Sequence, residues 1–182
     1  LGVANAIEVW SIAQGPVSQV RTGQFVVAGM LIQTDSATVL DGISAATPLV
    51  DGMRVAVWGQ MAGANATAWT ATRVARVTTS TTVSSGFVGD GTKLNGITLA
   101  GPLAASVPLG QLVRCEGALT APGPRLQVDT FRLLDLQVSD LQQGDAELEG
   151  LVTALLGGGR FLLGNVEIDA SAASISTTAQ TL

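Results

Sequence analysis

One β-hairpin pattern recurs three times along the chain, and it constrains the fold more than any other feature. Each copy places a two-residue turn between short apolar runs, and the turn pairs are Ala28-Gly29, Asn95-Gly96 and Gly164-Asn165. Glycine and asparagine tolerate the positive φ that tight hairpin turns require. The first turn residues lie 67 and then 69 residues apart (28 to 95, and 95 to 164). This period predicts a tandem array of one small all-β module.

A second pattern, glycine followed by six residues and another glycine, occurs at Gly52 to Gly59 and at Gly110 to Gly117. Alternation places apolar residues on one face of each segment, which is typical of a half-buried strand. These residues are Val55, Val57 and Met61 in the first segment, and Val113, Cys115 and Leu119 in the second. The second glycine falls within the strand, where a missing side chain suits a bulge or a sharp bend. We therefore expect strands that bend so that a short sheet can close.

The two patterns together predict two complete modules and two partial ones. Each complete module has three strands, a long connection and two further strands, and fewer than about 10% of residues are expected in helices. Modules of this size bury only about 60% of their unfolded surface, so packing against a neighbour would help them. The expected division is a final strand of an upstream module at 1–13, module one at 14–77, module two at 86–134, an acidic linker at 135–149 and a partial module three at 150–182.

The third module is expected to lack its last two strands, while residues 1–12 resemble the last strand of a module. A barrel without those strands exposes unpaired backbone groups that invite another strand. Either residues 1–12 supply a strand, in the same chain or from a second copy, or residues beyond Leu182 complete the module. The second alternative is favoured, because residues 1–12 match only one of the two missing strands. The chain is accordingly expected to be a fragment of a longer array.

The strand motifs also carry a resemblance. Gly-x-Val, Phe-x-x-x-Gly-x-x-Ile, Gly-x-x-Val-x-Val-x-Gly and Ala-Thr-Arg-Val resemble a bacterial domain-of-unknown-function repeat found in exported proteins and lipoproteins. That repeat has an OB-like β-barrel pattern, similar to small periplasmic OB-fold proteins. The resemblance implies tandem OB-like five-stranded barrels, export to the periplasm, outer envelope or exterior, and a non-enzymatic role, and it brings no functional residues. Module two departs from the pattern at Gly101-Pro102, which is expected to cut its third strand short.

The composition excludes several kinds of site. The chain has no His, no Tyr and a single Cys, which rules out Ser-His-Asp and Cys-His catalysis and thiolate or histidine zinc sites within it. Cys115 is expected to be a small buried hydrophobe, and Lys93 an exposed charge rather than a catalytic base. Gly157-Gly158-Gly159 lacks the Lys-Ser/Thr that follows in a phosphate loop and is expected to form a hairpin turn. We therefore expect no enzyme, no cofactor and no metal.

Charge and hydropathy limit the classes of partner that this chain is expected to bind. The net charge is -5 and the nine basic residues are scattered, which argues against nucleic acid binding. No apolar run approaches the ~20 residues that span a bilayer. The segment 135–149 holds five acids and no base, typical of a solvated linker. A calcium site there is the alternative, although the spacing matches no EF-hand loop.

The tryptophans are the main binding candidates. Trp58 and Arg54 lie on the face of their strand opposite Val55 and Val57, so both should point out of the barrel. An indole ring on an outer face is expected to have a packing or binding partner. Packing against the next module or the connecting loop is one alternative, and a sugar or peptide platform is another. Trp69 and Trp10 are expected on the final strands of modules, and the sequence does not determine whether their side chains face the barrel interior or the outside.

Together with the export that the resemblance implies, these observations predict a non-catalytic exported repeat protein that acts as a structural or protein-interaction element at the cell envelope. The alternative is a carbohydrate or small-ligand binding module that uses the outer sheet face near Trp58. Partners are expected to be protein or carbohydrate, with self-association through unpaired strand edges also open. Exposed aromatic residues in a concave stripe would favour the binding module, whereas buried ones would favour the scaffold.

Overall fold

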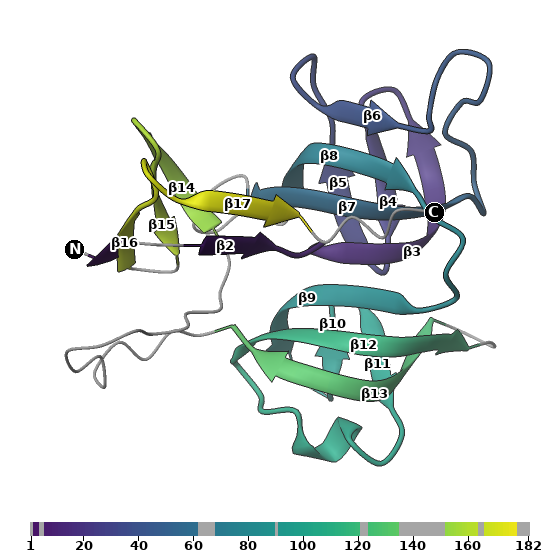
Figure 1. Cartoon of the computed structure of the whole chain (residues 1–182). Helices are drawn as coiled ribbons and strands as arrows, with labels where there is room; N and C mark the ends of the chain where they lie inside the picture. Colours follow the sequence, from purple (N-terminus) through teal and green to yellow (C-terminus); the bar gives the residue numbers. More distant parts are fainter. Residues whose placement is uncertain are drawn as a thin grey trace. The chain divides into compact units, whose positions relative to one another are not determined.

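The structure, a computed structural model, describes residues 2–3, 6–61, 68–89, 91–120, 124–134, 152–163 and 166–177. The described chain is all-β, with one short 3-10 helix, which confirms the expected fold class (Figure 1). It divides into two compact units. The larger one comprises Ser11–Leu133, and the smaller one combines Leu1–Trp10 with Leu134–Thr181. Each unit is described by itself.

The first half of the larger unit is a closed five-stranded barrel. Strand β3 pairs antiparallel with β4, β4 with β5, β7 with β8 and β7 with β3, while β5 and β8 run parallel and close the ring. A short strand, β6 (Val39–Asp41), lies parallel to β8 in the long connection. This is the predicted order of three strands, a connection and two strands. The barrel strands are β3 (Ala13–Arg21), β4 (Gln24–Val27), β5 (Met30–Gln33), β7 (Arg54–Met61) and β8 (Ala68–Arg76).

The second half repeats this order of pairing. Strands β9, β10, β11, β13 and β12 follow one another around a ring, and β11 and β13 are its parallel pair. The strand β11 is as long as β5, so Gly101-Pro102 does not shorten it as expected; the 3-10 helix η1 (Ala104–Ser106) follows in the connection. The strands are β9 (Thr82–Gly89), β10 (Lys93–Leu94), β11 (Ile97–Ala100), β12 (Leu112–Thr120) and β13 (Arg125–Leu133). That the two halves are tandem copies of one module stays a prediction.

The turns form as their residue types predict. Both turn residues of β4–β5 and of β10–β11 have positive φ: 48° and 77° at Ala28 and Gly29, and 52° and 81° at Asn95 and Gly96. Two positive φ values define the type I′ turn, whose twist matches that of the flanking strands. The third turn pair, 164–165, lies outside the described residues, and its flanking strands pair from Leu163 to Val166.

The bulges also occur where glycine predicted them. The register shifts between Trp58 and Gly59 in β7 and between Glu116 and Gly117 in β12. A Cβ at Gly59 would lie 2.2 Å from the Thr70 carbonyl oxygen, and one at Gly117 would lie 1.7 Å from that of Gln127. Any side chain would therefore force the strands apart, and glycine lets each sheet bend sharply enough to close.

The barrel interiors are filled by the predicted alternating residues. Val55 and Val57 from β7, and Val113 and Cys115 from β12, are fully buried. Leu119 was expected on the same face, but it is 36% exposed near the end of β12, beyond the bulge. The remaining largest fully buried side chains are Phe25, Met30, Ile32, Leu94, Leu126, Val27, Val74 and Thr82.

The smaller unit joins the two ends of the chain. Strands β14, β15 and β16 form an antiparallel sheet, β1 lies parallel to β16, and β2 lies parallel to β17. A tight turn at Gly158-Gly159 connects β14 to β15, as expected of a hairpin. The strands are β1 (Gly2–Val3), β2 (Ala6–Val9), β14 (Val152–Gly157), β15 (Arg160–Leu163), β16 (Val166–Asp169) and β17 (Ser174–Thr177).

Residues near the N-terminus therefore supply a strand to the third module within the same chain. Gly2 pairs with Ile168 as Trp69 pairs with Ile32 in the first barrel, so β1 and β2 take the place of β8. This is one of the two alternatives that the sequence left open. The other alternative is completion by residues beyond 182. It stays a prediction for the third module's counterpart of β7. The acidic segment 135–149 lies outside the described residues.

Candidate functional site

The most elaborate polar arrangement in the larger unit is the junction between its two barrels. Strand β3 of the first barrel pairs antiparallel with β9 of the second, from Ala13 to Ser84 and from Gln14 to Val83. The first five residues of β9, 82–86, are all buried, because one strand serves its own barrel and also faces the other. Three of them, Thr82, Ser84 and Ser85, are polar, and each is 0% exposed. Buried hydroxyls need partners, so their hydrogen bonds decide what this junction can do.

The two tight hairpin turns meet at this junction. The Ser84 hydroxyl donates to the Ala28 carbonyl oxygen at 2.9 Å, which links β9 to the turn of the first barrel. The Asn95 amide in the second turn donates to the Ser84 hydroxyl and to the Ser85 carbonyl oxygen, both at 2.9 Å. A Cβ at Gly29 would lie 2.3 Å from the Asn95 carbonyl oxygen. The turns thus touch through their backbones, and the serine hydroxyl connects them.

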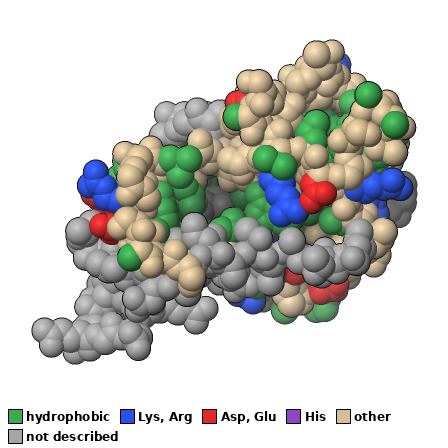
Figure 2. Space-filling model, turned by 45° about the horizontal axis from the view of Figure 1, so that its top comes forward, with side chains coloured by type: hydrophobic (Ala, Val, Ile, Leu, Met, Phe, Trp, Pro, Cys, Tyr) green, Lys and Arg blue, Asp and Glu red, His purple; other side chains and the backbone are tan. Residues whose placement is uncertain are grey.

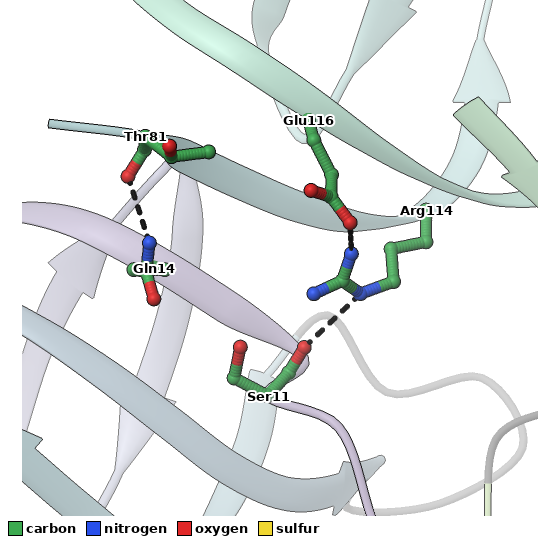
Figure 3. Close-up of polar contacts among 5 residues, drawn as sticks. All are labelled: Ser11, Gln14, Thr81, Arg114 and Glu116. Atoms are coloured by element: carbon green, nitrogen blue, oxygen red, sulfur yellow. Dashed lines mark hydrogen bonds and ion pairs between the residues drawn. The ribbon is translucent and has the colours of Figure 1, made fainter. Parts of the chain in front are cut away.

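Arg54 anchors the segment that connects the barrels. Its Nε donates to the Thr79 carbonyl oxygen at 2.5 Å, and its Nη2 donates to those of Ser80 and Thr81 at 2.8 Å. The Gln14 amide donates to the Thr81 carbonyl oxygen at 2.9 Å (Figure 3). A connection held at successive carbonyls cannot act as a loose tether. Residues 78–85, which the expected division left between modules one and two, are only partly a connection, because β9 begins at Thr82.

Arg114 forms a further contact across the junction. Its Nε donates to the Ser11 carbonyl oxygen at 3.3 Å, and its guanidinium pairs with Glu116 on the same strand (Figure 3). The Arg114 residue is 7% exposed. The carboxylate therefore compensates a charge that burial would otherwise penalise.

Two hydroxyls at the junction are left unsatisfied. Thr82 Oγ1 and Ser85 Oγ are buried without a hydrogen-bond partner in the described part of the chain. The Thr82 side chain faces Gly15, where a Cβ would lie 3.3 Å from Thr82 Cγ2. A buried hydroxyl without a partner costs stability, so these two atoms weaken a junction that is otherwise well bonded.

The predicted aromatic platform is covered. Trp58 lies on the face of β7 opposite Val57, as expected, but it is only 8% exposed. The guanidinium carbon of Arg73 lies 5.0 Å from the centroid of its ring, and Arg73 is paired with Asp41 of β6 at 2.5 Å. The guanidinium over the ring gives the indole a partner on the outer face, and Asp41 of β6 holds that guanidinium. Packing of Trp58 against the next module or the connecting loop stays a prediction.

The other candidate residues have separate roles. Trp69 is 4% exposed and pairs with the fully buried Ile32, so its ring belongs to the interior of the first barrel. Trp10 is 36% exposed and follows the end of β2, rather than lying within a strand as expected. Arg54 is bound to the connecting segment. That Trp58, Arg54, Trp69 or Trp10 binds a ligand or partner stays a prediction.

Burial and the distribution of charge set the electrostatics of the larger unit. Burial raises the pKa of the Cys115 thiol from its ordinary value of 9.0 to about 11, as expected of a buried thiol rather than a nucleophile. Within the described residues, no group of three or more Asp, Glu, Cys or His side chains is placed to hold a metal ion. Lys and Arg side chains are few and scattered on the face shown in Figure 2. Among the described residues, no helix has the length and apolar character to cross a membrane.

The sequence analysis missed the junction because it left Thr82, Ser84 and Ser85 in the Thr/Ser-rich stretch 78–85, outside both expected modules. A signal was available: β9 reads Thr-Val-Ser-Ser-Gly-Phe-Val-Gly, which fits no simple alternation. A strand with both faces buried loses its alternation. Polar residues in it then act as hydrogen-bonding groups of an interface.

The comparisons with known proteins bear on the first barrel. A family model described as Domain of unknown function (DUF5666) matches residues 14–75. Searches of the curated proteins and of the solved structures found no match. The matched residues run from β3 through nearly all of β8, so they include every strand of the first ring. Residues 14–75, which match this family model, thus form a closed five-stranded β-barrel.

Proposed function

We propose that this chain is a non-catalytic, exported repeat protein that serves as a structural and protein-interaction element at the cell envelope. Its two closed barrels act as one rigid spacer, and its binding capacity lies in strand pairing rather than in a pocket. Export rests on the resemblance to repeats of exported proteins. The spacer role rests on the junction between the barrels.

The observation that supports this role most strongly is the continuity of the two barrels. The strand pair β3–β9 joins their sheets, and the Ser84 hydroxyl bonds to both turns. Domains that move independently usually meet through exposed, flexible linkers crossed by few contacts. Here Arg54 binds three successive carbonyls of the connection. Such a junction fixes the relative orientation of its two parts, which a spacer needs.

The covered tryptophans also favour a scaffold over a carbohydrate platform. A stacking platform presents an open ring face to the sugar, whereas Trp58 carries Arg73 over its ring. Trp69 is an interior residue. Aromatic residues that pack within the chain stabilise the barrel, which is the arrangement expected of a scaffold.

The proposal is tested by asking whether the two barrels unfold together. Among the described residues, Trp58 and Trp69 report on the first barrel and Cys115 on the second; a Trp10→Phe background removes the tryptophan of the other unit. Urea transitions followed by tryptophan fluorescence and by thiol labelling are expected to coincide, as they do in a cooperative unit. Asn95→Gly keeps a residue that tolerates φ near 52° but removes the amide. It is expected to separate the two transitions.

The matched control is Ala28→Gly at the equivalent position of the first turn, which removes only a methyl group and keeps the backbone acceptor of Ser84. Its two transitions should still coincide. Separate transitions in the unsubstituted chain would contradict the rigid spacer. If added oligosaccharides changed the fluorescence of Trp58 or Trp69 in the folded protein, the carbohydrate-binding alternative would be favoured instead. Recovery of the protein from the cytoplasmic fraction of its source cells would contradict export.

A further inference from the structure

The turn residue Asn95 is followed by glycine, the sequence in which asparagine loses its side-chain amide most readily. Of the four asparagines in the chain, only Asn95 precedes a glycine. Glycine has no side chain to shield its backbone nitrogen, so that nitrogen can attack the side-chain carbonyl carbon of the asparagine before it. Gly96 is exposed, and a Cβ there would meet nothing within 4 Å in the described part of the chain. Water can therefore reach this turn in the folded protein.

The reaction at such a pair has two steps. Gly96 N forms a bond to Asn95 Cγ, the Cγ–Nδ2 bond breaks, and Nδ2 leaves as ammonia with the proton from Gly96 N. Water then opens the succinimide ring that has formed. Attack of water at Cγ gives aspartate, whereas attack at the main-chain carbonyl carbon gives isoaspartate, in which the chain continues through Cγ. Either product has a carboxylate in place of the neutral amide.

The type I′ turn holds the backbone of Asn95 away from the reactive geometry. A succinimide ring requires Asn95 Cβ and Gly96 N to be nearly eclipsed about the Cα–C bond. In a type I′ turn ψ of the first turn residue is about +30°, so the backbone nitrogen of Asn95, rather than its Cβ, lies near that position. Reaching the reactive geometry needs a large rotation of ψ, which also swings the Asn95 carbonyl group. That group lies against the turn of the first barrel, where a Cβ at Gly29 would be 2.3 Å from the Asn95 carbonyl oxygen.

The side-chain amide of Asn95 is also held in place. Its nitrogen has two protons to donate, and it donates to the Ser84 hydroxyl and to the Ser85 carbonyl oxygen, each at 2.9 Å. The amide lies against Gly86, where a Cβ would be 2.8 Å from Asn95 Oδ1. Asn95 Cγ can therefore turn toward Gly96 N only after the amide has left β9 and the two hairpin turns have separated.

We propose that Asn95 is a site of spontaneous deamidation that the closed junction between the barrels protects, and that its conversion to aspartate or isoaspartate prevents the junction from closing again. Water is the co-reactant and ammonia is released. The reaction itself depends on Asn95 and Gly96, whereas its consequence for the barrels rests on the rigid spacer proposed above. A carboxylate at position 95 is then a permanent record that the two barrels have separated.

The carboxylate cannot replace the hydrogen bonds of the amide. A carboxylate only accepts, so one of its oxygens would face the Ser85 carbonyl oxygen, which is also an acceptor. The Ser84 hydroxyl has a single proton, which it donates to the Ala28 carbonyl oxygen. If that proton turned to the carboxylate, the bond between β9 and the first turn would be lost. Isoaspartate also lengthens the main chain within a two-residue turn, which disturbs the register in which β10 pairs with β11.

The test compares deamidation of the full chain in its folded and unfolded states. Samples are incubated in mildly alkaline buffer with and without denaturing guanidinium chloride, and the peptide that contains residue 95 is analysed by mass spectrometry for deamidation and isoaspartate. We expect conversion to be at least about tenfold slower in the folded chain, because only the small population with an open junction reacts. Equal rates in the two states would overturn the inference, since the junction would then give no protection.

Two serine variants identify the group that protects the amide. Ser84→Ala removes the hydroxyl that accepts from Asn95 and should speed conversion in the folded chain several-fold. Ser85→Ala is the matched control, because the amide donates to the Ser85 backbone carbonyl and the Ser85 hydroxyl has no partner in the described part of the chain. Its conversion rate should equal that of the unsubstituted chain. With both variants shown by circular dichroism to be folded, equal rates in the two would overturn the inference, since the anchored amide would not control the reaction.

The consequence is measured on chain that has been deamidated in guanidinium chloride, refolded, and separated from unconverted chain by its additional negative charge. In the Trp10→Phe background its urea transitions, followed by tryptophan fluorescence and thiol labelling, should separate, as should those of Asn95→Asp. A sample refolded without incubation is the control and should keep coincident transitions. Coincident transitions in the deamidated chain as well would overturn this inference and leave the spacer in place. Separate transitions in the control would remove the spacer, while the mass spectra would still decide whether the folded chain protects Asn95.

Discussion

Single hydroxyl groups in β9 have opposite expected effects on stability. Thr82 Oγ1 is buried without a partner in the described part of the chain, so Thr82→Val removes an unsatisfied group and keeps the shape of the side chain. We expect the free energy of unfolding to rise by up to about 1 kcal/mol. Ser84→Ala removes a hydroxyl that bonds to Ala28 and Asn95, and should lower it by about 1–2 kcal/mol. Urea unfolding measures both, and a stabilising Ser84→Ala would contradict the assigned hydrogen bonds.

Cys115 should behave as a core residue whose thiol loses its proton only at high pH. Because burial raises its pKa to about 11 from 9.0, the folded state keeps the proton while the unfolded state loses it between these values. Its contribution to stability is therefore complete below pH 9 and is lost as the pH rises from 9 towards 11. Cys115→Ala should cost about 1 kcal/mol at neutral pH and remove this part of the alkaline decline. Unfolding measured from pH 7 to 11 tests this, and rapid thiol labelling of the folded protein at pH 8 would contradict the burial.

At the scale of elements, the bulges in β7 and β12 decide whether the barrels close. Gly59→Ala and Gly117→Ala place a Cβ against a backbone carbonyl that belongs to the paired strand and cannot rotate away. Each should destabilise its own barrel by about 3 kcal/mol or more, since overpacking against backbone is relieved only by moving the strand. Thermal unfolding followed by circular dichroism measures the loss.

Gly89→Ala is the matched control, because it also replaces a strand glycine. Its Cβ would lie 3.7 Å from the Lys93 carbonyl oxygen, an ordinary contact, and the position is exposed. It should change stability by no more than about 0.5 kcal/mol. An equal loss in all three variants would show that strand propensity, rather than the close approach at the bulge, determines the effect.

The same elements show how far the sequence reaches. The Asn-Gly and Ala-Gly turns and the bulge glycines were all predictable, because a turn type or a bulge is set by the φ angles and the side-chain volume of a few neighbouring residues. Strand β9 was partly missed for the converse reason. Its residues Thr82, Ser84 and Ser85 are polar, and only a second barrel packed against them makes a strand out of what reads as a linker.

For the whole molecule, the most consequential pairing connects residues that are far apart in the chain. Ile7 pairs with Ile175, and Gly2 pairs with Ile168, so both ends of the sequence build one unit. The similarity of residues 1–12 to a final strand indicated what they would become. It did not indicate whether they would pair with the third module of the same chain or of a second copy, because an unpaired strand edge accepts either.

By itself, the sequence determined the all-β class, the order of strands in a module, the buried thiol and the positions of turns and bulges. These follow from local φ preferences, alternation and side-chain volume, which act over a few residues. Only the tertiary structure decided that two barrels share the β3–β9 pair, that Arg73, paired with Asp41, lies over the Trp58 ring, and that the N-terminal strands join the third module. Each depends on which surfaces meet across long sequence separations, where burial and hydrogen bonding between distant residues, rather than local preference, set the free energy.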